Sequence, residues 1–229
     1  MDTGTSHDER SRLARHAGIT HDMTKNIASR TYQSRHIERV LRTILMYFII
    51  YAFIGWLYEG FIWIFKENQI MNRGFLYGPW LPIYGFGGIL LYATTYGFAK
   101  KPLYVKMAKS KINIKPFLTF LLISAGAAAI ELTATFIMQL CGLDFKILWH
   151  YDEYRINFQQ RIALIPALQF GVLGVIILYK AQNGINKFIL TKNRDTTLAQ
   201  WCIITLFFVD VIIHIFTGST YTDVPLLYL

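Results

Sequence analysis

Residues 72–89 read NRGFLYGPWLPIYGFGGI, and the interpretation of this stretch decides the fold predicted for the whole chain. The stretch is apolar enough to enter a bilayer, yet it holds two prolines and five glycines and begins with Asn72 and Arg73. Proline removes a backbone N–H and clashes with the preceding turn. The carbonyl groups that it frees are tolerated at membrane depth only inside protein or beside water. The stretch therefore predicts a broken membrane helix that lines a polar pocket. The residues assigned to this structural helix break are Gly74, Gly78, Pro79, Pro82 and Gly85.

The composition of the chain is that of a membrane protein. Of its 229 residues, 54% are hydrophobic and 16% are aromatic, which exceeds ordinary soluble usage. A helix needs about 20 mostly apolar residues to cross the hydrocarbon layer, and five blocks of the sequence reach this length. The predicted fold is therefore all-α, a polytopic helical membrane protein with about five transmembrane helices. The predicted spans are 44–65, 75–98, 117–141, 162–181 and 199–218.

The charge distribution predicts how the chain is oriented. Residues 1–43 are polar and basic and lack the pattern of a signal peptide, so we expect a cytoplasmic tail before a helical membrane domain at 44–229. Lys and Arg alternate between the connecting segments, with eighteen on one side and five on the other. The positive-inside rule then places the N-terminus in the cytoplasm and the C-terminus outside the cell membrane. The net charge of +9 thus reflects topology and attraction to the lipid bilayer, and no nucleic acid is expected as a partner.

Ionisable residues inside the predicted spans mark the candidate site. Glu59, Glu131 and Asp210 with His214 lie in odd-numbered spans at a similar depth toward the outer side. Arg161, like Arg73, begins an even-numbered span from that same side. Buried charges in a membrane are costly and are functional candidates by default. Two interpretations stay open. One is an outward-facing polar cavity, and the other is a set of salt bridges that fixes helix register, with Glu59–Arg73 and Glu131–Arg161 as pairs that the depths allow.

The outer connection at 142–161 adds aromatic and polar residues to this side. Trp149 and Tyr151 suit either an interfacial aromatic belt or a lid over the cavity, and Asn157 follows them. The candidate binding residues are Glu59, Asn72, Arg73, Tyr84, Glu131, Trp149, Tyr151, Asn157, Arg161, Asp210 and His214.

The sequence holds no motif that predicts catalysis or a cofactor. It has no recognisable nucleophile triad, no Cys/His metal spacing and no ATP-binding P-loop. No catalytic residue, cofactor or metal is therefore predicted, and the chain is interpreted as a non-enzyme rather than an enzyme.

Three motifs resemble one bacterial family. FIGWLYEG, NRGFLYGPWLPIYGFGG and LWHYDEYRINFQQRIAL are similar to the ABC-transporter type IV permeases (CmpB-like), over roughly residues 44–182. Glu59 matches the first motif. The second is matched by Asn72, Arg73, Gly74, Gly78, Pro79, Pro82, Tyr84 and Gly85. The third departs, because His150 stands where the family usually has Asp, and Gln160 where it usually has Gly before Arg161. The resemblance implies a multipass bacterial membrane protein and a role in transport.

These observations favour a transporter permease-like component that binds a small polar or charged solute. Two alternatives remain, namely a membrane enzyme or lipid-binding protein acting on outer-leaflet headgroups, and a structural, assembly or sensing protein. The basic segment 99–116 either lies on anionic lipid or docks a separate cytoplasmic ATPase. Small-residue spacings fit packing within the chain as well as homo-oligomerisation.

Overall fold

The computed structural model describes the backbone of residues 4–67, 69–72, 74, 76–107, 110–147, 149, 151–217 and 224–228. Side chains are described in the same ranges, except for residues 4–28, 66–67, 69–72, 107, 110, 147 and 224–228. By its contacts the chain divides into two compact units, Met1–Ile44 and Leu45–Leu229.

The first unit is the beginning of one long helix. Helix α1 (Gly4–Glu67) has 64 residues and continues into the second unit. Every described side chain of residues 29–41 is exposed, and Glu38 lies 3.9 Å from Arg42 in an i,i+4 ion pair. The Glu38 side chain of this pair is exposed, whereas the Arg42 side chain is buried. The cytoplasmic position of residues 1–43 stays a prediction.

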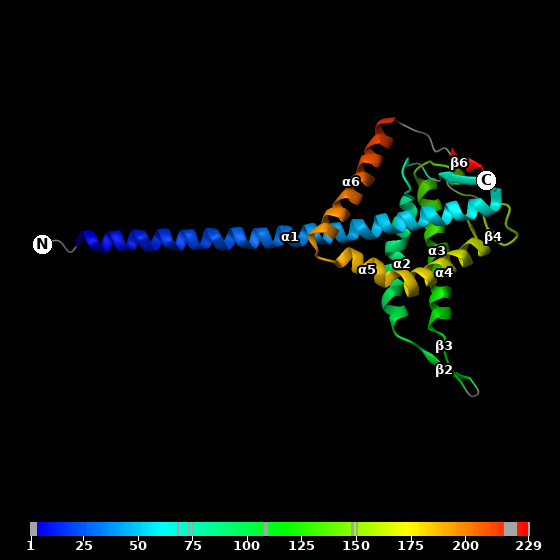
Figure 1. Cartoon of the computed structure of the whole chain (residues 1–229), viewed down its shortest axis with the longest axis horizontal. Helices are drawn as coiled ribbons and strands as arrows, with labels where there is room; N and C mark the ends of the chain where they lie inside the picture. The colour runs from blue at the N-terminus through cyan, green and yellow to red at the C-terminus, as the bar shows by residue number, and fades with distance from the viewer. Residues whose placement is uncertain are drawn as a thin grey trace. The chain divides into compact units, whose positions relative to one another are not determined.

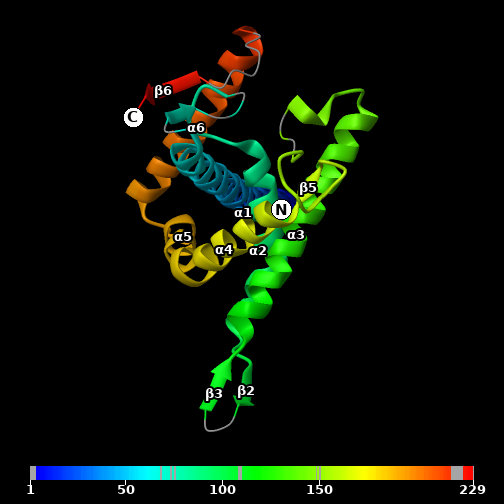
Figure 2. The same cartoon turned by 90° about the vertical axis from the view of Figure 1, so that its right-hand side faces the viewer.

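The second unit is helical apart from three small two-stranded sheets and the connecting segments (Figure 1). After α1 come β1 (Gln69–Asn72), α2 (Pro82–Lys100), β2 (Tyr104–Met107), β3 (Ser110–Asn113), α3 (Lys115–Leu140), η1 (Phe145–Ile147), β4 (Asn157–Phe158), β5 (Ile162–Ala163), α4 (Leu164–Ile176), the π-helical turn η2 (Ile177–Ala181), α5 (Gln182–Leu190), α6 (Arg194–Thr217) and β6 (Val224–Tyr228). The strands pair antiparallel as β1–β6, β2–β3 and β4–β5. Figure 2 shows β2–β3 as a hairpin at the start of α3. The predicted all-α fold class is confirmed.

Four helices in the described part of the chain are long and apolar enough to cross a membrane. They cover Ser29–Phe65, Lys115–Leu140, Leu164–Leu190 and Arg194–Thr217. These ranges overlap the first, third, fourth and fifth predicted spans. The fourth range combines α4, η2 and α5 into one continuous helical segment.

The predicted second span at 75–98 differs from the structure. Helix α2 has 19 residues, begins at Pro82 and is not among the four apolar helices found in the described residues. Its sequence is rich in tyrosine, threonine and glycine, which lowers its hydropathy. Proline suits the start of a helix because the first turn makes no use of its missing N–H. The helix therefore starts later than the apolar run does.

Helices α1 and α2 pack antiparallel through glycines. Gly55 of α1 lies against the ring of Tyr84, and Gly88 of α2 lies against the ring of Tyr51. A Cβ atom would come within 2.2 Å of ring atoms at Gly55 and within 2.5 Å at Gly88. The absence of a side chain at these two positions therefore permits the close approach of the helices.

Helix α3 runs antiparallel to both of its neighbours. Gly126 of α3 faces Leu91 of α2, while Lys115, at the start of α3, has its ammonium over the ring of Phe98 near the end of α2. On the other side, Gly171 of α4 lies against Ser124, and Thr119 Oγ1 lies 3.2 Å from the hydroxyl of Tyr179 in η2, which continues α4. Consecutive helices thus reverse direction from α1 to α4.

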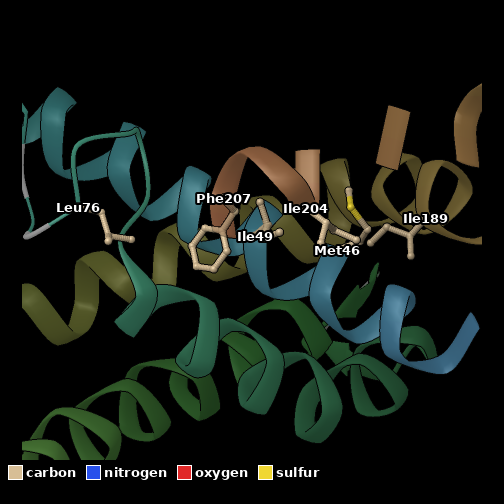
Figure 3. Packing of buried hydrophobic residues seen from close by; sticks show 6 residues of the cluster. All are labelled: Met46, Ile49, Leu76, Ile189, Ile204 and Phe207. Atoms are coloured by element: carbon tan, nitrogen blue, oxygen red, sulfur yellow. The ribbon is translucent and has the colours of Figure 1, made fainter. Parts of the chain in front are cut away.

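The buried apolar cluster joins segments that are far apart in sequence. It brings together side chains from α1, the segment before α2, α5 and α6 (Figure 3). Its members are Met46, Ile49, Leu76, Ile189, Ile204 and Phe207. The cluster secures α6 and the segment before α2 against α1.

Candidate functional site

The segment before α2 is a loop anchored by hydrogen bonds to α6 and α1. The carboxylate of Asp210 accepts hydrogen bonds from the backbone N–H groups of Tyr77 (3.2 Å) and Gly78 (2.9 Å). Trp80 N–H donates to the carbonyl of Gly78 at 2.8 Å, and Leu81 N–H donates to the carbonyl of Ala52 at 3.1 Å. The backbone donors of this loop therefore find acceptors from three parts of the chain.

This geometry corrects the predicted helix break. Gly74 and Gly78 precede the helix, as does Pro79, so they do not interrupt it. Gly74 has a φ of +104°, a conformation that glycine adopts without steric cost. Pro82 occupies the first turn of α2. Gly85 lies inside α2, where a Cβ would come within 2.7 Å of the Phe48 ring. The prolines and glycines therefore shape a loop and a close helix contact.

The histidine of α6 belongs to the same anchoring region. The His214 ring makes an edge-to-face contact with the Tyr77 ring at a centroid distance of 6.1 Å. The Tyr77 hydroxyl lies 2.7 Å from Thr217 Oγ1. Asp210 and His214 thus hold the loop before α2 and do not line the cavity that follows.

A cavity of about 730 Å³ lies among α1, α2, α3, α4 and the 142–163 connection. Two carboxylates of the spans, Glu59 and Glu131, belong to its lining. The remaining lining is mostly apolar and aromatic, with a few amides and hydroxyls and with Lys146 and Glu153 from the 142–163 connection. Ligand pockets typically have volumes of about 300–1,000 Å³ and few polar groups, so both its size and its lining suit a small molecule.

Each of these two carboxylates accepts a hydrogen bond from a tyrosine. Tyr84 donates to Glu59 Oε1 at 2.7 Å, and Tyr151 donates to Glu131 Oε1 at 2.6 Å. Burial, followed by the nearby charges of Glu131 and Glu59, holds the pKa of the Tyr151 hydroxyl well above its usual range. Tyr151 therefore keeps its proton and acts as a donor from the loop to α3.

Glu131 retains unused acceptor capacity in a buried position. The side chain is 9% exposed, and among the described residues its second oxygen, Oε2, has no hydrogen-bond partner. A buried polar atom without a partner costs free energy, and the cost is greater for a charged group. The cavity beside it offers the space in which a ligand could supply that partner.

The far end of the cavity is bordered by an uncharged polar network. The Tyr51 hydroxyl donates to Gln182 Oε1 at 2.9 Å, and Gln182 Nε2 donates to Asn186 Oδ1 at 2.7 Å. Asn186 also accepts from Tyr47 at 2.8 Å and donates to the Tyr96 hydroxyl at 2.8 Å. These bonds join α1, α2 and α5, and they satisfy polar groups that would otherwise be costly in a membrane.

The arginine of the 142–163 connection has partners other than an acid. Arg161 Nη2 donates to Gln139 Oε1 at 2.6 Å, and its guanidinium lies 4.7 Å from the Phe136 ring centre and 4.3 Å from that of Phe145. Trp149 Nε1 donates to the Arg161 carbonyl at 3.1 Å. The pair Glu131–Arg161 that the sequence allowed does not form, because Glu131 accepts from Tyr151 and Arg161 bonds Gln139.

The cavity contains some of the predicted binding residues and not others. Its lining includes Glu59, Tyr84, Glu131, Trp149 and Tyr151. Arg161, Asp210 and His214 have the positions given above. Asn157 bonds its own loop, through the Tyr154 carbonyl and the Gln160 N–H.

Three of the residues named in the sequence analysis have no described side chain. Of Asn72 the structure describes only the backbone, in β1. Arg73 lies outside the described residues, and so does His150 of the third motif.

Sequence reasoning missed several lining residues. Tyr58, Gln169 and Gln182 line the cavity from α1, α4 and α5, and Tyr154 does so from the 142–163 connection. Glutamine within an apolar helix was the signal that could have identified two of them, because an amide in a span needs a partner just as an acid does.

The four long apolar helices of the described residues define a polytopic helical membrane protein. The family described as "Putative ABC-transporter type IV" matches residues 46–215, and the chain belongs to this family. The match extends past the resemblance noted in the sequence and includes α6 with Asp210 and His214. No curated protein and no solved structure gives a significant match.

Proposed function

We propose that this chain is a permease-like component of a membrane transporter and binds a small polar or charged solute in its cavity. The observation that supports this proposal most directly is the cavity of about 730 Å³ among the helices and the 142–163 connection, with the Glu59 and Glu131 carboxylates in its lining. Family membership supports a transport role. Charges inside a membrane bundle commonly mark solute pathways. We assign this role to Glu59 and Glu131.

The proposed orientation has the N-terminus in the cytoplasm and the C-terminus outside, with the cavity toward the outer side. It is supported by the excess of Lys and Arg on one set of connections. The reversal of direction between consecutive helices from α1 to α4 fits this alternation. Strand β1, after α1, pairs with β6, after α6, which is consistent with both helices ending on the same side.

The β2–β3 hairpin is the part of the chain that we propose docks a separate cytoplasmic ATPase. Lys106 and Lys111 of the hairpin are exposed, as are Lys101 just before it and the apolar side chains of Val105 and Ile112. An exposed basic and apolar hairpin suits an acidic partner surface. Co-purification of an ATPase with the parent chain, and its loss when Lys106 and Lys111 are replaced by Glu, would support this partner. Homo-oligomerisation also stays a proposal.

The transport proposal is tested by filling the cavity. Gly87 lines it and has nothing closer than 3.9 Å to an added Cβ, so Gly87→Phe places a ring in the solute space. Gly97→Phe is the matched control, because Gly97 lies on the same helix with nothing within 4 Å and is not part of the lining.

Cells lacking the chain are compared with cells carrying the parent or either variant, by measuring uptake of a labelled solute library. We expect at least one solute whose uptake is restored by the parent and by Gly97→Phe but not by Gly87→Phe. Full restoration by Gly87→Phe would contradict the proposal. A change in outer-leaflet headgroups with unchanged uptake would instead favour the lipid-directed alternative.

A further inference from the structure

Among the described residues, the charged side chains that line the cavity are mostly acidic. Its acidic lining residues are Glu59, Glu131 and Glu153, and the only basic residue in the lining that the structure describes is Lys146. Glu153 and Lys146 are both exposed and therefore sit where water screens them. Of the described acidic lining residues, Glu59 and Glu131 are thus the ones less exposed to water.

Glu131 carries the strongest requirement for a positive ligand. It is 9% exposed, its Oε1 accepts from the Tyr151 hydroxyl, and Oε2 has no hydrogen-bond partner among the described residues. A carboxylate removed from water is costly unless a cation or several donors compensate it. Arg161, which the sequence allowed as the ion-pair partner of Glu131, directs its guanidinium to Gln139 and to two phenylalanine rings.

Aromatic rings occupy the wall beside these acids. Tyr58, Tyr84 and Phe170 lie within 5.6–6.2 Å of one another, centre to centre, and all three line the cavity. Tyr151 and Tyr154 make an edge-to-face pair at 5.6 Å on the loop side. The faces of aromatic rings attract organic cations, most strongly away from water. Acids and rings in one cavity therefore favour the same kind of ligand.

We propose that the solute bound in this cavity is a small organic cation with an ammonium group. Its positive charge lies between the Glu59 and Glu131 carboxylates, and its alkyl groups contact the tyrosine and phenylalanine rings. The uncharged network of Tyr51 and Gln182 at the far end accommodates a hydroxyl or amide on the same molecule. This inference rests on the proposed function, because it names the class of solute that the transporter would carry.

Three probes of similar shape and different charge test the inference. They are choline, its neutral isostere 3,3-dimethyl-1-butanol, and the anion 3,3-dimethylbutanoate. The full-length chain, purified into lipid nanodiscs, is titrated with each by calorimetry, and tetraethylammonium and spermidine extend the range of cations. We expect at least one cation to bind, and choline, if it is that cation, to bind at least about tenfold more tightly than its neutral isostere.

Variants locate the binding site. Glu131→Gln keeps an oxygen for the Tyr151 hydroxyl but removes the charge, and we expect it to weaken cation binding at least about tenfold. Asp195→Asn is the matched control, since it removes one acidic charge at an exposed position in the first turn of α6 and should leave binding within about twofold. If Glu131→Gln does not fold, Glu59→Gln makes the same test at the second carboxylate.

Several outcomes would overturn the inference. These are equal binding of the cation and its neutral isostere, tighter binding of the anion, unchanged cation binding in the Glu131 and Glu59 variants, or no cation binding below about 10 mM. If a neutral or anionic probe binds tightly and Gly87→Phe abolishes that binding, the inference of a cationic solute is refuted and the transport proposal stands. Cation binding combined with uptake that Gly87→Phe leaves unchanged would support the cation as ligand and refute the transport proposal.

Discussion

Asp210 is an acid within an apolar helix whose partners are backbone groups of another segment. It accepts hydrogen bonds from the N–H groups of Tyr77 and Gly78, at 3.2 and 2.9 Å. Hydrogen bonds to a charged acceptor contribute more than neutral ones. At this residue the charge therefore serves to position the loop before α2.

Replacing Asp210 by Ala should destabilise the protein by about 1.5–3 kcal/mol, because charged acceptors contribute about that much and the Gly78 N–H loses its acceptor. The measurement is the apparent Tm of the protein purified in detergent, with Asp195→Asn as the control. An unchanged Tm in Asp210→Ala would show that the loop is held by other contacts. At temperatures below its Tm, Asp210→Ala should bind the cation as the parent does, because Asp210 is not part of the cavity lining.

Arg161 illustrates a buried charge held by aromatic rings. Its guanidinium lies within 4.7 Å of the ring centres of Phe136 and Phe145, and it donates to Gln139. A lysine keeps the charge but loses the planar stacking surface and the fork of donors. The identity of this side chain, and not only its charge, therefore holds the connection against α3.

Arg161→Lys should loosen the 142–163 connection, at a cost of up to about 2 kcal/mol for the lost stacking. We expect faster proteolytic cleavage in this connection in the variant. Arg155→Lys is the matched control, because Arg155 is exposed on the same connection and should cleave at the parental rate. Equal cleavage of all three proteins would refute a stacking role for Arg161.

At the scale of elements, the contact between α1 and α2 depends on two small residues. Gly55 and Gly88 each lie under a tyrosine ring of the opposite helix, Tyr84 and Tyr51 respectively. Those same tyrosines donate to Glu59 and Gln182 at the cavity. Close packing of the two helices therefore sets the positions of polar groups in the site.

Gly88→Ala should destabilise the protein by about 1–3 kcal/mol, since its Cβ would lie 2.5 Å from the Tyr51 ring and overpacking typically costs that much. Gly97→Ala, on the same helix in open space, should be neutral or stabilising by up to about 1 kcal/mol through helix propensity. Thermal unfolding of the two variants in parallel makes the comparison. A loss of stability in Gly97→Ala equal to that in Gly88→Ala would mean that α2 tolerates no substitution, whatever its contacts.

The sequence could locate most of the helices but not the start of α2. Spans are readable because lipid demands about 20 apolar residues in a row, and four helices satisfy this rule. Residues 75–81 are apolar too, yet Leu81 N–H bonds the carbonyl of Ala52 and two neighbouring N–H groups bond Asp210. Those long-range bonds decide between loop and helix, and no local pattern reveals them.

The sequence predicts a depth for each candidate acid but not the direction in which its side chain points. Glu59, Glu131 and Asp210 lie at similar depths by sequence position, yet only the first two line the cavity. Which face of a helix points inward depends on its neighbours. Arg161 shows the same limit, because its partner Gln139 lies two turns along α3 from Glu131.

At the scale of the whole molecule, the orientation depends on whether α2 crosses the membrane. Its 19 residues give a helix of about 28 Å at 1.5 Å per residue, close to the ~30 Å hydrocarbon thickness. It packs antiparallel to α1 and α3, and the ammonium of Lys100 at its end lies 4.1 Å from the Tyr96 ring centre. A basic residue at a helix end suits the interface, where its head reaches water.

If α2 crosses, the chain makes five crossings and its termini lie on opposite sides. We expect an N-terminal epitope tag to be protected from antibody in intact cells and a C-terminal tag to be accessible. The exposed Cys141, at the end of α3, should react with an impermeant maleimide from outside in a Cys202→Ser variant. Lys106→Cys, in a chain whose two native cysteines are replaced by serine, should react with the same maleimide only after the cells are permeabilised. Two tags on the same side, with Cys141 still labelled from outside, would show that α2 enters and leaves by one face, because the remaining four helices give an even number of crossings.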